Sequence, residues 1–93
     1  MKIGDRVGAI LSADNKNVHF LGFGVYQGDT VPDPLILGSS FPFENPTIKL
    51  DSGEIVYGVE CWWGPEAEVQ QQIKGRLIIH TDIRRVRNGE TNG

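Results

Sequence analysis

The chain has 93 residues, of which 39% are apolar and 23% charged, enough for one hydrophobic core and unlike a disordered chain. No apolar run approaches the roughly 20 residues that a membrane-spanning helix needs, so we expect no membrane contact. The formal net charge of −3 argues against a general polyanion binder, which needs a basic surface. The lone cysteine, Cys61, cannot form an internal disulfide and favours a reducing cytoplasm.

Apolar patterning in the first half predicts two strands and a long loop. Residues 3–11 form the first strand and 14–17 a turn rich in short polar side chains. Residues 18–27 are apolar on both faces and contain glycines where side chains would otherwise project, which predicts a central, curved strand. Residues 28–46 contain four prolines, so regular structure is not expected, yet their apolar content predicts an ordered loop that packs on something.

The second half begins with the clearest hairpin in the chain. Strands over 47–50 and 54–63 flank Asp51-Ser52-Gly53, with Gly53 in the left-handed position of the turn. Proline and two glutamates then open a short helix over about 65–74, and Lys74-Gly75 ends it. A final strand is expected within 76–86.

These elements predict a mainly β fold. We expect a small, strongly bent antiparallel sheet, or an SH3-like barrel, of about five strands with one short helix. The predicted domain covers residues 1–87 with a long ordered loop at 28–46, and residues 88–93 form a frayed tail.

Trp62 is the main candidate for contact with a partner or ligand. If the strand continues through 60–63, Trp63 falls on the core face, whereas Trp62 and Glu60 fall on the other face. A tryptophan outside the core pattern is typical of an interface or a ligand shelf. The alternative is structural: Trp62 lies beneath the following helix or the long loop.

The 28–46 loop is the second candidate, because it has more apolar surface than so small a core can easily cover. We expect these side chains to form the contact of a two-fold homodimer. Alternatively, the loop folds back as a lid over the barrel mouth and buries its own side chains. The residues concerned are Leu35, Ile36, Leu37, Phe41 and Phe43.

Catalytic and metal sites find little support. Cys61 could act as a nucleophile with His19 or His80 as base, but a single cysteine on an apolar strand face is typically a small buried hydrophobe. Two histidines and one cysteine match no metal-ligand spacing. We therefore expect no catalytic residue, no metal and no cofactor.

A basic cluster near the C-terminus is the basis of an alternative function. With Trp62 it could hold single-stranded nucleic acid by stacking and charge. A solvated terminal strand is the simpler interpretation in an acidic chain. The candidate residues for this contact are Arg76, Arg84, Arg85 and Arg87.

Two stretches resemble known groups of proteins. Gly4-Asp5-Arg6-Val7, followed by a glycine-rich strand, resembles the opening of SH3-like small barrels. Residues 51–66 are similar to uncharacterised small proteins of phages and integron-type mobile gene cassettes, a group that implies no assigned function and no catalytic residue.

Small barrels of this kind typically bind rather than catalyse. The favoured hypothesis is thus a non-catalytic module for protein–protein contact or self-association. The alternatives are nucleic-acid binding through the C-terminal strand and a small-molecule pocket under the 28–46 loop.

Overall fold

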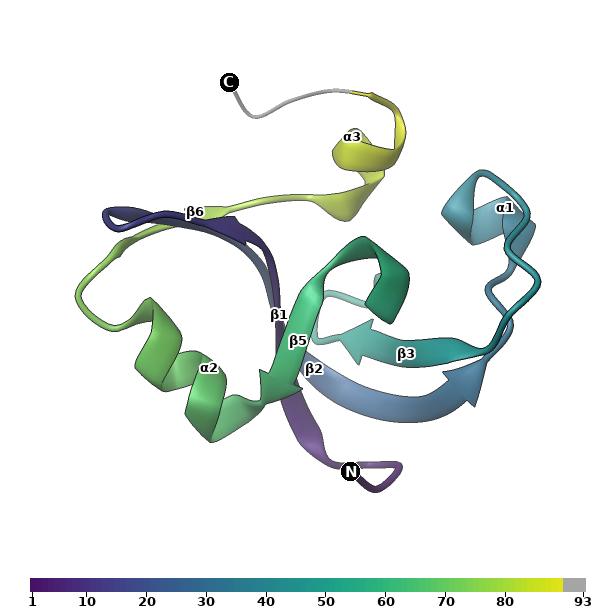
Figure 1. Cartoon of the computed structure of the whole chain (residues 1–93), viewed down its shortest axis with the longest axis horizontal. Helices are drawn as coiled ribbons and strands as arrows, with labels where there is room; N and C mark the ends of the chain where they lie inside the picture. The colour runs from purple at the N-terminus through teal and green to yellow at the C-terminus, as the bar shows by residue number, and fades with distance from the viewer. Residues whose placement is uncertain (90–93) are drawn as a thin grey trace.

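The computed structural model describes residues 1–89 and confirms a mainly β fold (Figure 1). The residues 90–93 of the expected frayed tail lie outside the described part. The strands are β1 (Arg6–Ala13), β2 (Asn17–Thr30), β3 (Asn45–Leu50), β4 (Ile55–Tyr57), β5 (Trp62–Pro65) and β6 (Leu77–His80). The helices are α1 (Pro34–Leu37), α2 (Glu66–Ile73) and α3 (Ile83–Arg87), with a 3-10 turn, η1, at Gly58–Glu60.

The long strand β2 lies at the centre of a six-stranded sheet with the order β4-β3-β2-β1-β5. β1 pairs with β2 along one edge, from Arg6 to Ala13. The other edge of β2 is shared, because its second half pairs with β3 and its first four residues pair with β6. Only the β2–β6 pairing is parallel; the others are antiparallel. The sheet bends strongly, as predicted, but β4 and β5 do not close it into a barrel.

Two glycines of β2 have different roles, and the first, Gly22, lets the central strand bend as predicted. Gly22 has φ +138°, a conformation that side chains disfavour, and lies next to a bulge at which Leu21 is the extra residue of β2. At Gly24 the backbone of β3 approaches so closely that a Cβ would overlap the Lys49 carbonyl oxygen and lie 2.7 Å from Cα of Leu50. Gly24 is therefore required for the β2–β3 pairing rather than for an unusual dihedral angle.

Each face of the sheet has its own hydrophobic cluster. The larger cluster fills the concave face and includes Ile83 of α3, with Trp63 packed against it. The smaller cluster lies between the sheet and α2, which contributes Val69. The buried members of the larger cluster are Val7, Ala9, Leu21, Tyr26, Ile48, Leu50, Val56 and Ile83; those of the smaller are Ile10, Val18, Phe20 and Val69.

The hairpin turn is confirmed, but the strand expected over 54–63 is broken. Gly53 has φ +97° and its N–H donates to the Leu50 carbonyl at 2.8 Å. The second strand ends at Tyr57, where η1 turns the chain before β5 begins. The turn is stabilised because the Glu60 carboxylate accepts a hydrogen bond from the Tyr57 N–H at 3.1 Å. The Glu60 carboxylate, three residues after Tyr57, thus favours a turn where the alternating pattern of the sequence predicts a continuous strand.

The helix expected over 65–74 is present as α2, but α1 and α3 were not predicted. Both begin after an aspartate whose side chain accepts a backbone N–H: Asp33 from Leu35 and Asp82 from Arg84, each at 2.9 Å. The final strand expected within 76–86 is present as β6 and ends at His80, before α3 begins. The arginines assigned to a basic terminal strand, Arg84, Arg85 and Arg87, lie on α3 instead.

Candidate functional site

The loop candidates lie together around α1, at the end of the sheet remote from β6 and α2 (Figure 1). The loop is ordered, as predicted: Pro32 is fully buried, and the Asp33 N–H donates to the Tyr57 hydroxyl at 3.1 Å. Its apolar side chains are nevertheless open to solvent. Leu35 is 94% exposed and Phe43 is 69% exposed.

We call this surface the loop patch. Phe41 packs edge-on against Phe43, with ring centroids 5.8 Å apart, so the two rings are arranged by contact with each other. Ile36, Leu37 and Phe41 are partly buried, whereas Val31 is 55% exposed, so the loop covers only part of this apolar surface. The loop patch consists of Val31, Leu35, Ile36, Leu37, Phe41 and Phe43.

Trp63 is the less exposed of the two tryptophans, as predicted, although it is partly rather than fully buried. The Trp63 ring stacks on Tyr26 at a centroid distance of 5.5 Å and an interplanar angle of 8° on the concave face. Trp62 lies on the α2 side of the sheet and is 48% exposed. Its ring lies over Gly64, where a Cβ would come within 3.6 Å of it. Trp62 is thus beside α2 rather than beneath it.

Trp62 lines a groove that we call the Trp62 groove, with a volume of about 310 Å³. One side of the groove is formed by the end of β1. The other side is formed by α2 and by Arg76, which lies three residues after the end of the helix. Sequence patterns gave no signal that these segments meet. The lining residues are Ile10, Leu11, Ser12, Ala13, Trp62, Gln72 and Arg76.

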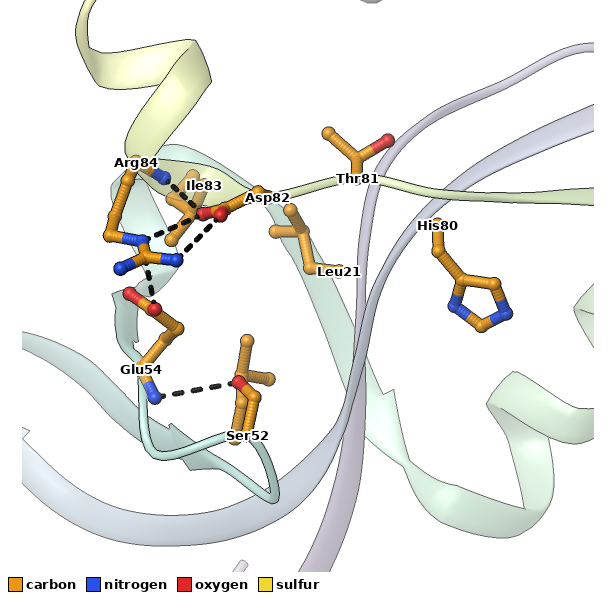
Figure 2. A pocket seen from close by; sticks show the side chains of 9 residues that line it. Leu21, Ser52, Glu54, His80, Thr81, Asp82, Ile83 and Arg84 are labelled. Atoms are coloured by element: carbon orange, nitrogen blue, oxygen red, sulfur yellow. Dashed lines mark hydrogen bonds and ion pairs between the residues drawn. The ribbon is translucent and has the colours of Figure 1, made fainter.

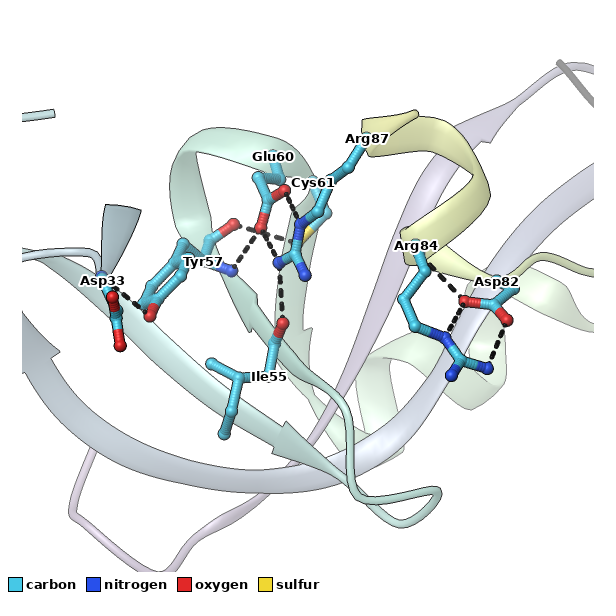
Figure 3. Close-up of polar contacts among 8 residues, drawn as sticks. All are labelled: Asp33, Ile55, Tyr57, Glu60, Cys61, Asp82, Arg84 and Arg87. Carbon is cyan, nitrogen blue, oxygen red and sulfur yellow. Dashed lines mark hydrogen bonds and ion pairs between the residues drawn. The ribbon is translucent and has the colours of Figure 1, made fainter. Parts of the chain in front are cut away.

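Glu60 does not share the Trp62 surface; it forms a buried ion pair with Arg87 (Figure 3). Arg87 Nη2 lies 2.6 Å from Glu60 Oε1, and Nε lies 2.7 Å from Oε2. The two side chains are only 11% and 10% exposed, respectively. Hydrogen bonding to Glu60 raises the pKa of the Arg87 guanidinium above its ordinary value. Both residues therefore serve the fold and neither is available to a partner.

The remaining arginines do not form one basic surface. Arg84 forms two ion pairs: its Nη2 lies 2.9 Å from Asp82 Oδ2 and its Nε lies 3.0 Å from Glu54 Oε1. All three residues line a cleft of about 270 Å³ (Figure 2). Among residues 1–89, Arg76 and Arg85 form no ion pair. Arg76 lies between α2 and β6, whereas Arg85 lies on α3. The cleft beside Arg84 and the Trp62 groove contain no residue of the 28–46 loop, so neither is the pocket expected beneath it.

Cys61 is a poor nucleophile in this environment. Burial and, as a smaller cause, the nearby Glu60 charge raise the pKa of the Cys61 thiol to about 12. Almost no thiolate therefore forms at neutral pH. Its Sγ donates to the Tyr57 carbonyl at 3.5 Å rather than contacting a histidine. Within residues 1–89, no three histidine, cysteine or acidic side chains are grouped as metal ligands.

Comparisons with known proteins do not add a function. No family model, curated protein or solved structure matches the chain. The resemblances to SH3-like barrels and to mobile-cassette proteins therefore stay predictions. No helix among residues 1–89 has the length and apolar character needed to cross a membrane.

Proposed function

We propose that this protein is a non-catalytic interaction module that self-associates through the loop patch. The observation that carries the proposal is the exposure of Leu35 and Phe43, 94% and 69%, on one loop that is itself anchored to the sheet. An exposed leucine alone needs no explanation, but several exposed apolar side chains on one ordered segment are typical of an interface.

A second copy of the chain is the simplest occupant. In a two-fold dimer one patch covers its own equivalent, so a single surface serves both partners. The loop is already ordered by the Asp33–Tyr57 contact and by buried Pro32, so association has little backbone entropy to remove.

The charges around the patch predict how salt affects association. Asp33 and Glu44 are both exposed on this loop, and a two-fold contact brings like charges toward each other. Added salt screens this repulsion, so dimerisation should strengthen with ionic strength. Binding of an anionic partner through the arginines of α3 would instead weaken as the ionic strength rises.

Sedimentation velocity over a concentration series tests the proposal. The parent should show a concentration-dependent dimer, and Leu35→Glu or Phe43→Glu should shift it to monomer. Leu77→Glu is a matched control, because Leu77 is 65% exposed but lies on β6, away from α1 (Figure 1). A parent that stays monomeric throughout, or a dimer abolished equally by Leu77→Glu, would overturn the proposal.

A further inference from the structure

The Trp62 groove coincides with an open edge of the sheet. β5 pairs with β1 only from Val7 to Ile10, where Ile10 faces Trp62. Residues 58–60, which precede β5, form η1 instead of extending the strand alongside Leu11–Ala13. Among residues 1–89, no strand therefore pairs with Leu11–Ala13 on the β5 side. These same residues line the groove.

The groove also holds two side chains suited to recognition. Trp62, 48% exposed, offers an apolar ring at the end of the open edge. Arg76 lines the same groove and has no ion pair within residues 1–89. Gln72 of α2 adds an amide that can both donate and accept. A tryptophan and an arginine are the residue types that most often dominate binding energy at interfaces.

We propose that the groove binds an extended peptide segment that adds to β1 as a strand, in line with β5. Its backbone would pair with the open edge at Leu11–Ala13, as in other cases of strand addition. An apolar side chain would lie against Trp62, and a carboxylate would pair with Arg76. Because side chains on one face of a strand recur every second residue, the apolar and acidic residues should be two or four positions apart.

The charge pattern favours an acidic peptide over single-stranded nucleic acid. A nucleic-acid strand needs a track of positive charge along its backbone. Arg76 is the only basic residue that lines the groove, and the chain as a whole carries a net charge of −3. Arg84 and Arg87 are already paired with carboxylates of the fold. A single free guanidinium matches one carboxylate of a peptide.

Selection from a random heptapeptide display library tests the assignment. We expect enriched peptides with an acidic and an apolar residue at alternate positions, and Trp62 fluorescence should change when they bind. Trp62→Ala and Gln72→Ala should each weaken binding, the first by about tenfold or more. Arg76→Glu should reverse the charge preference and select basic peptides.

Two matched controls separate this site from other surfaces. Arg85→Glu makes the same charge change on α3 and should leave peptide binding unchanged. Leu35→Glu, which removes the proposed dimer contact, should also leave it unchanged, so either proposal can fail without the other.

The site assignment is overturned if no peptide is enriched, or if selected peptides bind Trp62→Ala as tightly as the parent. It is also overturned if an oligothymidylate binds the parent more tightly than the peptides do. Hydrogen exchange checks the backbone pairing separately: a bound peptide should slow exchange within Leu11–Ala13, and unchanged exchange there would refute strand addition.

Discussion

Replacing Arg87 by alanine should destabilise the fold more than replacing any other arginine among residues 1–89. Arg87 connects α3 to two other elements (Figure 3). Its guanidinium makes two hydrogen bonds to Glu60 of η1, and Nη2 donates to the Ile55 carbonyl of β4 at 2.7 Å. Removing it leaves the Glu60 carboxylate, only 10% exposed, without its counter-charge.

The expected cost follows from that unpaired charge. Breaking a buried pair by removing one partner costs roughly 3–5 kcal/mol. A 93-residue domain has a total stability of about 5–14 kcal/mol at typical values per residue. The loss is therefore a large part of the total and should lower the melting temperature by roughly 12–40 °C.

Urea unfolding followed by circular dichroism measures this cost, with Arg84→Ala as the control. The Arg84 side chain also pairs with two carboxylates but is 67% exposed, so its loss should cost much less than the loss of Arg87. Replacing Glu60 and Arg87 together by methionine should recover much of the loss, because no unpaired charge is left. Equal costs for Arg87→Ala and Arg84→Ala would refute the reasoning.

Four further predictions concern individual side chains. Gly24→Ala should lower the free energy of unfolding by about 1–3 kcal/mol, because a methyl group would meet the backbone of β3; a variant as stable as the parent would mean a wider strand spacing. Gly53→Val should cost about 1 kcal/mol or more in the same urea assay, because a β-branched residue resists φ +97°; no loss would contradict the turn. Trp63→Ala should cost about 3 kcal/mol, and Trp62→Ala clearly less, because only Trp63 packs against the concave core; the reverse order would place the indoles on the wrong faces. Cys61 should react with iodoacetamide slowly in the native state and rapidly in denaturant, because burial raises the pKa of its thiol to about 12; equal rates would show an accessible thiolate.

Local sequence signals were sufficient where the structure depends on near neighbours. The Asp51-Ser52-Gly53 turn and the helix after Pro65 both depend on residues a few positions apart, and both are present. The alternation that places Trp63 inward and Trp62 outward also held, because β5 keeps a strand register through both residues.

The failures come from side chains that bind backbone or distant partners. Asp33 and Asp82 each cap a helix in segments read as loop and strand. Glu60 was assigned to the surface by strand alternation, but η1 turns it toward Arg87, 27 positions away in the sequence. No pattern in a single sequence indicates such a pair.

The Trp62 groove was foreseen only in part, because the sequence analysis joined Trp62 with Arg76 only in a nucleic-acid contact that also included the arginines of α3. It forms because β5 is shorter than β1 and because the segment after α2 brings Arg76 to the same groove. Both features depend on how the elements pack together in the tertiary structure. The loop candidates were identified directly, since apolar residues in a proline-rich segment are visible without a structure.

Concentration-dependent nitrogen-15 NMR spectra can locate self-association at the loop patch residue by residue. On dilution from millimolar to micromolar protein, amide shifts should change around Leu35 and Phe43, and those of Leu77 on β6 should stay constant. Spectra that do not change with concentration, or changes confined to β6 and α3, would contradict self-association at the loop patch.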